Sequence, residues 1–371
     1  MIKLRSAAAL FTTGVMVISM AGCGGSADTA AESSSETSAE TSEESYTIGI
    51  IKQMDHVALN NSEEGFVDAL ADNGLVDGEN LTIDYENGQG DTNNLATIAD
   101  QFVADNVDLV FAIATNAAQA VAGKTTDIPI VGTAITSYTE AALVDSDEVP
   151  GGNVTGTTDM NPVEEQINLI AEVCPDVETI GFLYCSNEAN SILQVEMAKE
   201  ACEALGYSTV EQTVSSTNEV QQATQNIVTE CDAIYIPTDN VFASSMALVD
   251  DVATPAGIPV FCGESGMVMS GGFATLGISY YSIGYQTGLM AVDILLNGAD
   301  PAEMAIQGSA EFEYCFNGET ADALGIEIPE KYADSVQYSS DEEADETAEG
   351  EEEAAEDTDG EEEAADEAET E

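Results

Sequence analysis

Positive charge and histidine are scarce in this sequence. Six of the 371 residues are lysine or arginine, against 71 aspartates and glutamates, and the formal net charge is −65 at pH 7. A chain with so few cations cannot neutralise phosphate groups, which excludes nucleic acid as a partner and disfavours enzymes of free phosphate esters. His56 is the single histidine, and no Cys-x-x-Cys pair occurs, so the sequence predicts no structural zinc or other metal site.

Motifs of catalysis and of nucleotide binding are absent as well. The chain has no P-loop, no dinucleotide fingerprint and no Gly-x-Ser-x-Gly nucleophile motif. Residues 263–266 (GESG) resemble half of the last motif, but the histidine that it requires would have to be His56. We therefore expect neither an enzyme nor a cofactor.

The N-terminus has the pattern of a secretory signal followed by a lipid-attachment site. Lys3 and Arg5 precede an apolar run at residues 7–20, which is too short to span a bilayer comfortably. The run ends in Met-Ala-Gly-Cys, which resembles the lipobox of bacterial lipoproteins, where the cysteine carries a diacylglycerol. We expect a signal peptide at residues 1–22 and lipid on Cys23, where two acyl chains give stable anchoring. An ordinary secretory signal with an incidental cysteine is the alternative.

Two low-complexity segments flank the part of the chain that can fold. Residues 23–45 are almost wholly Gly, Ser, Thr, Ala and Glu, and residues 341–371 contain only Asp, Glu, Ala, Gly and Thr. We expect both to be disordered, the first as a tether and the second as an acidic tail. The acidic excess favours solubility on a crowded cell exterior, and steering of cationic solutes is the alternative. About 290 residues lie between the two segments, a length that usually forms two domains.

The cysteines of this central part are expected to be buried free thiols. Their spacings match no compact disulfide framework, and a core of this size is stable without disulfides. Most of them stand in or beside apolar strand-like runs, as buried thiols do. They are Cys174, Cys185, Cys202, Cys231, Cys262 and Cys315.

The central part repeats one order of alternating strands and helices. Three features recur in sequence: an Ile-Gly strand, an Asp followed by an apolar run and a Thr, and a strand that begins Ile-Pro. In the first half they occupy residues 46–52, 108–116 and 128–134, and in the second half residues 179–185, 232–240 and 258–264. Such alternation gives parallel sheets with right-handed crossovers, whose strands are continuous apolar runs because both faces are buried. The sequence predicts two doubly wound α/β lobes.

The chain must pass between these lobes more than once. The glycine-rich residues 151–156 are the expected first crossing, residues 273–279 the return, and the segment from residue 312 the third. Residues 46–156 and 281–310 are then the N-terminal lobe, and residues 157–280 and 311–340 the C-terminal lobe. Three crossings are typical of the type I periplasmic-binding protein fold, and doubly wound sheets bind ligands beyond the carboxyl ends of their strands.

Several motifs resemble one protein family directly. The motifs are DLVFAIATNAAQ at residues 108–119, IPIVGTA at 128–134, PGGNVTG at 150–156, DAIYIPTDN at 232–240 and GISYYSIGYQTG at 277–288. Together they resemble the ABC-transporter substrate-binding lipoproteins, and among those the branch whose better-known members bind tryptophan and other aromatic amino acids. The resemblance covers residues 46–329, and the acidic tail departs from it.

The resemblance implies a function and a set of partners. It implies a type I binding protein, anchored by lipid on the extracytoplasmic face of the cell membrane, with an amino acid, aromatic in this branch, as its ligand. An ABC permease and its ATPase would be the partners, and lobe closure around the solute would form the surface that the permease recognises. We expect a monomer. A membrane-tethered sensory receptor for a nucleoside or sugar is the alternative.

Candidate ligand contacts follow from the rule that solutes bind at strand ends. Thr115 and Asn116 begin a helix, where amides and a hydroxyl suit a carboxylate, whereas Asp239 or Glu264 would suit an ammonium. Helix capping is the alternative role of Thr115, Ser186 and Asp239. Tyr280 would stack on an aromatic solute, with core packing as its alternative. The full set is Met54, Asn87, Gln89, Thr115, Asn116, Thr133, Ser186, Asn187, Glu188, Asp239, Asn240, Glu264 and Tyr280.

Overall fold

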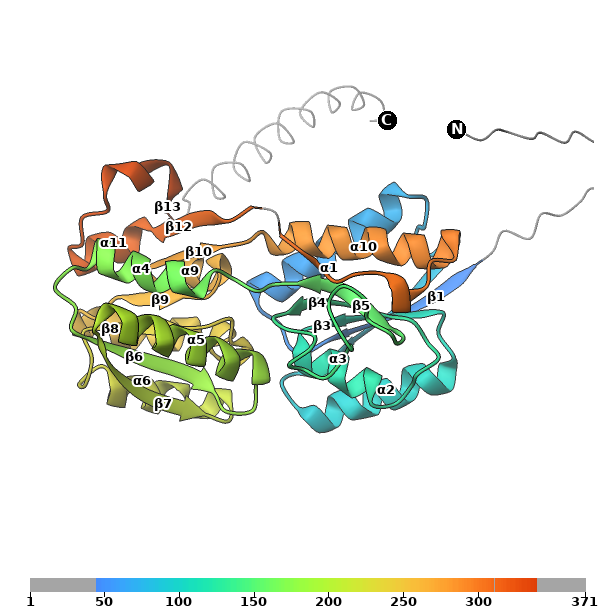
Figure 1. Cartoon of the computed structure of the whole chain (residues 1–371), viewed down its shortest axis with the longest axis horizontal. Helices are drawn as coiled ribbons and strands as arrows, with labels where there is room; N and C mark the ends of the chain where they lie inside the picture. Colours follow the sequence, from blue (N-terminus) through green and yellow to red (C-terminus); the bar gives the residue numbers. More distant parts are fainter. Residues whose placement is uncertain (1–44, 310, 339–371) are drawn as a thin grey trace, which may run out of the picture. The chain divides into compact units, whose positions relative to one another are not determined.

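The computed structural model describes residues 45–309 and 311–338 (Figure 1). The expected signal peptide, the lipid site at Cys23, nearly all of the tether and the acidic tail lie outside these residues. Within the described ranges, no helix has both the length and the apolar character that a membrane span requires.

The first sheet is entirely parallel and has the strand order β11-β5-β4-β3-β1-β2. Ile50 of β1 lies opposite Tyr85 of β2 on one side and Phe111 of β3 on the other. The strands are β1 (Tyr46–Lys52), β2 (Leu81–Asn87), β3 (Leu109–Ile113), β4 (Ile130–Ile135), β5 (Val154–Thr158) and β11 (Gln307–Gly308).

Helices cover both faces of this sheet. Ile50 belongs to the hydrophobic cluster under α1 and α10, and its neighbour Ile51 to the cluster under α2 and α3. Successive strand residues point to opposite faces, so a strand buried on both sides reads as an unbroken apolar run. Phe66 of α1 stacks on Phe111 of β3 with ring centroids 3.7 Å apart. The helices are α1 (Val57–Asp72), α2 (Thr92–Asp105), α3 (Thr115–Ala122) and α10 (Tyr280–Asn297), with the short 3-10 helix η2 (Pro301–Glu303).

The second sheet repeats this plan with the order β13-β12-β10-β9-β8-β6-β7. Its strands are parallel except at the β10–β12 pair, which is antiparallel because β12 arrives from the first sheet. The two doubly wound lobes that the repeat predicts are therefore confirmed. The strands are β6 (Thr179–Cys185), β7 (Ser208–Val214), β8 (Ala233–Ile236), β9 (Val260–Cys262), β10 (Ala274–Gly277), β12 (Glu313–Asn317) and β13 (Val336–Gln337).

Helices again pack on both faces of the second sheet. Val163, Val195 and Ala321 mark the cluster under α4, α5 and α11, while Ile227 and Val249 mark the cluster on the other face. The helices are α4 (Val163–Val173), α5 (Ala189–Leu205), α6 (Val220–Ile227), α7 (Asn240–Ala243), α8 (Met246–Ala256), α9 (Ser265–Met269) and α11 (Gly318–Leu324), with the 3-10 helices η1 (Thr217–Glu219) and η3 (Glu330–Ser335).

The chain passes between the sheets after β5, after β10 and between β11 and β12. The first passage does not lie at residues 151–156 as expected, because β5 pairs Val154 and Gly156 with β4 and continues to Thr158. Gly156 has φ +147°, and a Cβ at this position would collide with the backbone of Gly132. This glycine therefore permits close strand packing rather than hinge rotation. Most of the expected return is likewise a strand, β10, which leaves residues 278 and 279 as the link.

Glycines also allow α10 to lie directly against α1. A Cβ on Gly284 would stand 2.7 Å from the carbonyl carbon of Ser62, and one on Gly288 would stand 2.6 Å from the Cβ of Ala69. The buried Ser62 hydroxyl donates to the carbonyl oxygen of Tyr280 at 3.2 Å. Helix α10 follows the second lobe in sequence, yet this contact makes it part of the first.

Candidate functional site

Two hydrogen bonds join residues that follow the carboxyl ends of the strands in the first sheet to residues at the corresponding end of the second sheet. Gln53, directly after β1, donates from Nε2 to Oε1 of Glu188, which precedes α5, at 3.1 Å. His56, the N-cap of α1, and Asn240, the first residue of α7, share a bond of 3.1 Å between Nε2 and Oδ1. Ligands of doubly wound sheets bind beyond the carboxyl ends of the strands, so this junction is the candidate solute site.

Glu188 is a fully buried acid of the junction, with 1% of its surface exposed. Its Oε2 accepts hydrogen bonds from the backbone nitrogen of Asn240 at 3.1 Å, from Nδ2 of Asn240 at 2.7 Å and from Nδ2 of Asn190 at 3.4 Å. Burial, and then the charge of Asp239, raises the pKa of the Glu188 carboxyl to about 8, although these bonds act in the opposite direction.

Several buried polar atoms around the junction have no hydrogen-bond partner within residues 45–309 and 311–338. They are Oε1 of Gln53, Nδ1 of His56, Oγ1 of Thr115 and Oδ1 of Asn190. Buried polar atoms in folded proteins are nearly always satisfied, because an unmet one costs about 1–3 kcal/mol. Their concentration at one junction indicates a place that receives a polar molecule.

The N-terminus of α3 enters the junction from the first lobe. Its N-cap, Ala114, has φ +82°, a conformation that costs a residue with a side chain roughly 1–3 kcal/mol and that clusters at ligand sites. Thr115 borders a small hollow of about 180 Å³ together with Asn190 of the second lobe. Asn116 borders a larger one of about 590 Å³, partly open to solvent, together with Glu188.

A second group of hydrogen bonds joins the lobes beside the crossings. Gln194 of α5 donates from Nε2 to Oγ1 of Thr136 at 3.1 Å and also to the hydroxyl of Thr238. Thr136 donates to Oδ1 of Asp159 at 2.9 Å, and the hydroxyl of Tyr280 donates to Oδ2 of the same carboxylate at 2.8 Å. Burial raises the pKa of Asp159. The group links α5, near the junction, with residues of the first and second crossings.

The structure separates the residues expected to contact the solute into several places. Some lie at the junction or border the hollows beside it, and others cap helices or form hydrogen bonds within their own lobe. Met54 is buried at the end of β1, and a Cβ on Gly90 would come within 3.4 Å of its methyl carbon. The junction residues of the expected set are Met54, Thr115, Asn116, Asn187, Glu188 and Asn240.

Two of the expected acids are occupied as helix N-caps. Asp239 accepts from the backbone nitrogens of Phe242 at 3.0 Å and Cys185 at 2.6 Å. Glu264 accepts from those of Gly266 at 2.5 Å and Met267 at 2.8 Å, and burial raises its pKa to about 7. The capping role weighed for Asp239 is thus observed, and both carboxylates already have strong local partners.

Three further residues of the expected set have other surroundings. Thr133 lies in the core of the first lobe, where its hydroxyl is 3.0 Å from that of Thr157. Ser186 donates its hydroxyl to the carbonyl of Val214 at 3.1 Å. Tyr280 is 5% exposed and packs in the hydrophobic cluster between the first sheet and helices α1 and α10. Its hydroxyl donates a hydrogen bond to the carboxylate of Asp159 at the first crossing.

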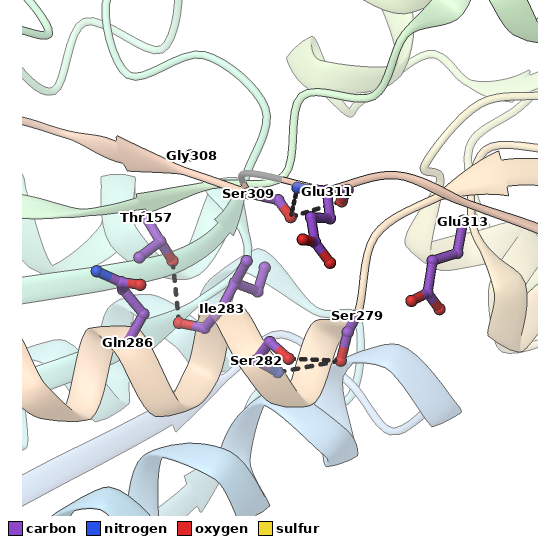
Figure 2. Close-up of a pocket in the computed structure, with 9 residues that line it drawn as sticks. All are labelled: Thr157, Ser279, Ser282, Ile283, Gln286, Gly308, Ser309, Glu311 and Glu313. Carbon is purple, nitrogen blue, oxygen red and sulfur yellow. Dashed lines mark hydrogen bonds between the residues drawn. The ribbon is translucent and has the colours of Figure 1, made fainter.

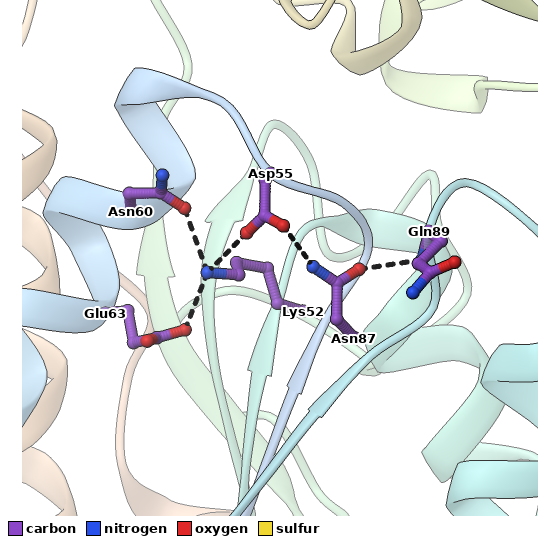
Figure 3. Close-up of polar contacts among 6 residues, drawn as sticks. All are labelled: Lys52, Asp55, Asn60, Glu63, Asn87 and Gln89. Carbon is purple, nitrogen blue, oxygen red and sulfur yellow. Dashed lines mark hydrogen bonds and ion pairs between the residues drawn. The ribbon is translucent and has the colours of Figure 1, made fainter.

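The loop that carries Gln53 and His56 is held by an ion cluster at its exposed rim. Figure 3 shows Lys52 with its ammonium between Asp55, at 2.9 Å, and Glu63 of α1, at 3.0 Å. Asn87 donates to Asp55 at 2.8 Å and accepts from the backbone nitrogen of Gln89 at 2.7 Å. The rim residues Asn87 and Gln89 therefore position the β1–α1 loop.

A further hollow of about 740 Å³ lies beside the second and third crossings (Figure 2). Ser279 and Ser282 bond to each other at its edge, at 3.0 Å between hydroxyl oxygens, and Glu311 and Glu313 border it on the other side. None of its lining residues has a buried polar atom that lacks a partner in the described part of the chain. It is therefore a weaker candidate for a solute site than the junction.

Sequence reasoning missed Asn190, Gln194 and Asp159. Asn190 and Gln194 stand one helical turn apart on α5 and are both buried. Polar residues at the buried positions of a helix were the available signal, because they must find polar partners there.

Comparison with known proteins gives consistent relatives. A family model described as ABC transporter substrate binding protein matches residues 47–337. The chain is 36% identical over 346 residues to a tyrosine-binding protein of Clostridioides difficile (strain R20291), covering 93% of this chain and 99% of that protein. A crystal structure of an ABC domain from Streptococcus pneumonia in complex with L-Trp is 37% identical, with a TM-score of 0.76 over 79% of this chain and 99% of that chain.

A second solved relative has a ligand-free, open structure. The ligand-free, open structure of a substrate binding protein with adhesive properties from Clostridium difficile is 41% identical and covers 79% of this chain and 98% of that chain. Its TM-score is 0.61, lower than that of the L-Trp complex although its sequence is more similar. The expected type I periplasmic-binding fold is confirmed by these relatives. The chain belongs to the family of ABC transporter substrate binding proteins.

Proposed function

We propose that this protein captures an aromatic amino acid between its lobes and delivers it to the permease of an ABC importer, whose ATPase drives uptake. It acts by binding alone and catalyses no reaction. It is held on the extracytoplasmic face of the membrane by lipid on Cys23. Relatives named for tyrosine and crystallised with L-Trp support the choice of ligand.

The observation that carries the proposal is the set of unpartnered buried polar atoms contributed by both lobes. Thr115 and the amides of α3 offer donors to a carboxylate on the first lobe, where the helix dipole also favours negative charge. Glu188 and Asn190 offer acceptors to an ammonium on the second. An α-amino acid carries both groups, so it bridges the lobes and stabilises the closed arrangement.

Apolar side chains border the same space and suit a hydrophobic side chain on the solute. Ala141 and Leu193, from opposite lobes, border the hollow at Thr115, and Val241 borders the hollow at Glu188. The thioether of Met54 is a favourable neighbour for an aromatic ring.

Thermal denaturation of the full chain tests the ligand class. L-tyrosine, L-tryptophan and L-phenylalanine are compared with L-leucine, a nucleoside and a sugar. A ligand at one hundred times its Kd stabilises the native state by about 2.7 kcal/mol, which raises Tm by roughly 5–10 °C for a chain of this size. If the aromatic amino acids leave Tm unmoved while the nucleoside or the sugar raises it, the ligand assignment is wrong.

A pair of threonine variants tests the location of the site. Thr115→Val removes a hydroxyl without a partner, so it should weaken binding about 10-fold and leave the stability of the unliganded protein unchanged or higher. Thr133→Val removes a hydroxyl bonded in the core, so it should lower Tm and leave the Kd unchanged. The reverse pattern, with Thr133→Val weakening binding and Thr115→Val without effect on the Kd, would contradict this placement.

A further inference from the structure

Glu188 is a buried carboxyl whose hydrogen-bond donors are all uncharged. The side chains of Gln53 and Asn190 and the backbone and side chain of Asn240 supply them, at 2.7 to 3.4 Å. Moving a carboxylate out of water is costly unless a cation compensates its charge, so buried acids are normally paired.

The cations of the described ranges are all engaged elsewhere. Figure 3 shows that Lys52, although it precedes Gln53, directs its ammonium to Asp55 and Glu63 at the rim. The remaining pairs in residues 45–309 and 311–338 are Lys124 with Asp100, Lys199 with Glu211 and Lys331 with Glu172. A positive charge that would stabilise the ionised form of Glu188 is thus not supplied by these residues.

The titratable groups around Glu188 are acidic or neutral. Asp239, before α7, is a second buried carboxyl, and Asp91, the N-cap of α2, borders the same hollow. Cys185, at the end of β6, is a thiol whose pKa burial raises to about 12. From the β1–α1 loop, His56 is neutral at pH 7 because burial lowers its pKa to about 4. An anion at this place would meet carboxylates, whereas an ammonium would balance them.

The amide side chains next to Glu188 present two more acceptors. Gln53 directs its amide nitrogen at Glu188, and Asn190 shares its amide nitrogen between Glu188, at 3.4 Å, and the carbonyl oxygen of Thr238, at 2.8 Å. Their carbonyl oxygens, one from each lobe, are left buried and without a partner in the described part of the chain. A primary ammonium has three N–H donors and no acceptor, so one carboxylate oxygen and two amide oxygens satisfy it completely.

We infer that Glu188, with the amide oxygens of Gln53 and Asn190, selects the ammonium group of the solute, and that capture at neutral pH releases a proton from Glu188. This deepens the proposed function and rests on it. The O–H bond of the neutral Glu188 carboxyl breaks, its proton passes to the buffer, and a carboxylate–ammonium pair remains. Burial raises the pKa of the Glu188 carboxyl to about 8, so the neutral form predominates at pH 7 before binding.

Titration calorimetry of the full chain with L-tyrosine measures the released proton. The binding enthalpy is determined in phosphate and in Tris, whose ionisation enthalpies differ widely. The difference should correspond to net release of protons on tyrosine binding at pH 7, and to a smaller release as the pH rises above the raised pKa of Glu188. This measurement uses the unaltered protein, so it does not depend on the folding of a variant.

Two analogues of tyrosine separate the contributions of the ammonium and the carboxylate. Tyramine keeps the ammonium and lacks the carboxylate, and it should bind with proton release. 3-(4-Hydroxyphenyl)propionate keeps the carboxylate and lacks the ammonium, and it should bind at least about 100-fold more weakly than tyrosine, because a buried charge-assisted bond is lost.

A variant and a matched control assign the proton to one side chain. Glu188→Gln should weaken tyrosine binding about 10- to 100-fold and abolish the buffer dependence. Glu196→Gln, the same change at an exposed position of α5, should alter neither. A melting curve of each variant verifies that it is folded; should Glu188→Gln fail to fold, the buffer comparison and the two analogues decide the matter.

The outcomes separate this inference from the function on which it rests. Tyrosine binding with an enthalpy that is independent of the buffer would overturn the inference and leave the proposed function standing. Equal affinity for tyrosine and the deaminated acid would do the same. Failure of all three aromatic amino acids to bind would overturn the proposed function, and the inference with it.

Discussion

The packing of α10 on α1 can be tested by placing a methyl group between the two helices. In Gly284→Ala the new Cβ would collide with the carbonyl oxygen of Ser62 and lie 2.7 Å from its carbonyl carbon. Both partners are helix backbone, so rotation of a side chain cannot relieve the contact. The helices must move apart or the backbone must distort.

The expected cost follows from two opposing effects. Alanine favours a helix over glycine by roughly 0.5–1 kcal/mol. Overpacking of a close-packed interior costs about 1–3 kcal/mol. The contact here is with backbone, which places the overpacking cost at the upper end of that range, so we expect a net destabilisation of about 2 kcal/mol. In a chain of this size that corresponds to a fall in Tm of roughly 4–8 °C.

Thermal unfolding followed by circular dichroism measures this fall. Gln286→Ala, at an exposed position of the same helix, is the control and should change Tm by less than about 1 °C, because exposed helix positions tolerate alanine. A Tm for Gly284→Ala that equals or exceeds that of the unaltered protein would show that the helices are not held at this distance in solution.

Three further perturbations test groups buried elsewhere. Burial raises the pKa of Glu264 from 4.5 to about 7, so the contribution of this carboxyl to stability is present below about pH 4.5 and is lost as the pH rises to 7. Glu264→Gln should therefore flatten the fall of Tm between about pH 4.5 and 7. A fall of Tm as steep as that of the unaltered protein would contradict this. Burial raises the pKa of Cys202 and Cys231 to about 12, so iodoacetamide at pH 8 should label them far more slowly in the native chain than in urea, and equal rates would contradict their burial. Tyr280→Phe removes a hydrogen-bond donor from the buried carboxylate of Asp159 and should lower the free energy of unfolding in denaturant by about 1–3 kcal/mol. Tyr281→Phe, at an exposed site, should lower it little. Equal effects of the two changes would refute this difference.

The layout of the two lobes was predictable because each repeats strands with strong local signals. Residues 46–52 and 179–185 coincide with β1 and β6, since short runs rich in β-branched and aromatic residues and bounded by polar loops are typical of strands. Hydrophobic pattern and turn residues act locally, so one sequence suffices to interpret them.

The crossings were harder to predict because glycine has two uses. At residues 151–156 it suggested a hinge, but Gly156 is required by the close approach of β4, a contact with a residue more than twenty positions away. A sequence taken alone does not distinguish conformational freedom from lack of space. Only the paired strand reveals which of the two applies.

The candidate site was predictable as a region and not as a set of contacts. The strand-end rule points to the loops of Thr115 and Glu188, which the structure places at the junction of the two lobes, because topology determines which loops face each other. Asn190 and Gln194 were missed because their role depends on the rotation of α5 about its axis relative to the other lobe. That angle is set by tertiary packing, which one helix's sequence does not specify.

The short second crossing limits how the binding cleft can open. Three Cα steps separate the end of β10 at Gly277 from the start of α10 at Tyr280, so these Cα atoms can never be more than about 11 Å apart. Translation of one lobe away from the other is thereby restricted, and wide opening has to come from rotation about an axis close to this link. The aperture through which a solute enters then grows in proportion to the distance from the crossings. The β1–α1 loop with its ion cluster is part of the rim at which that aperture forms.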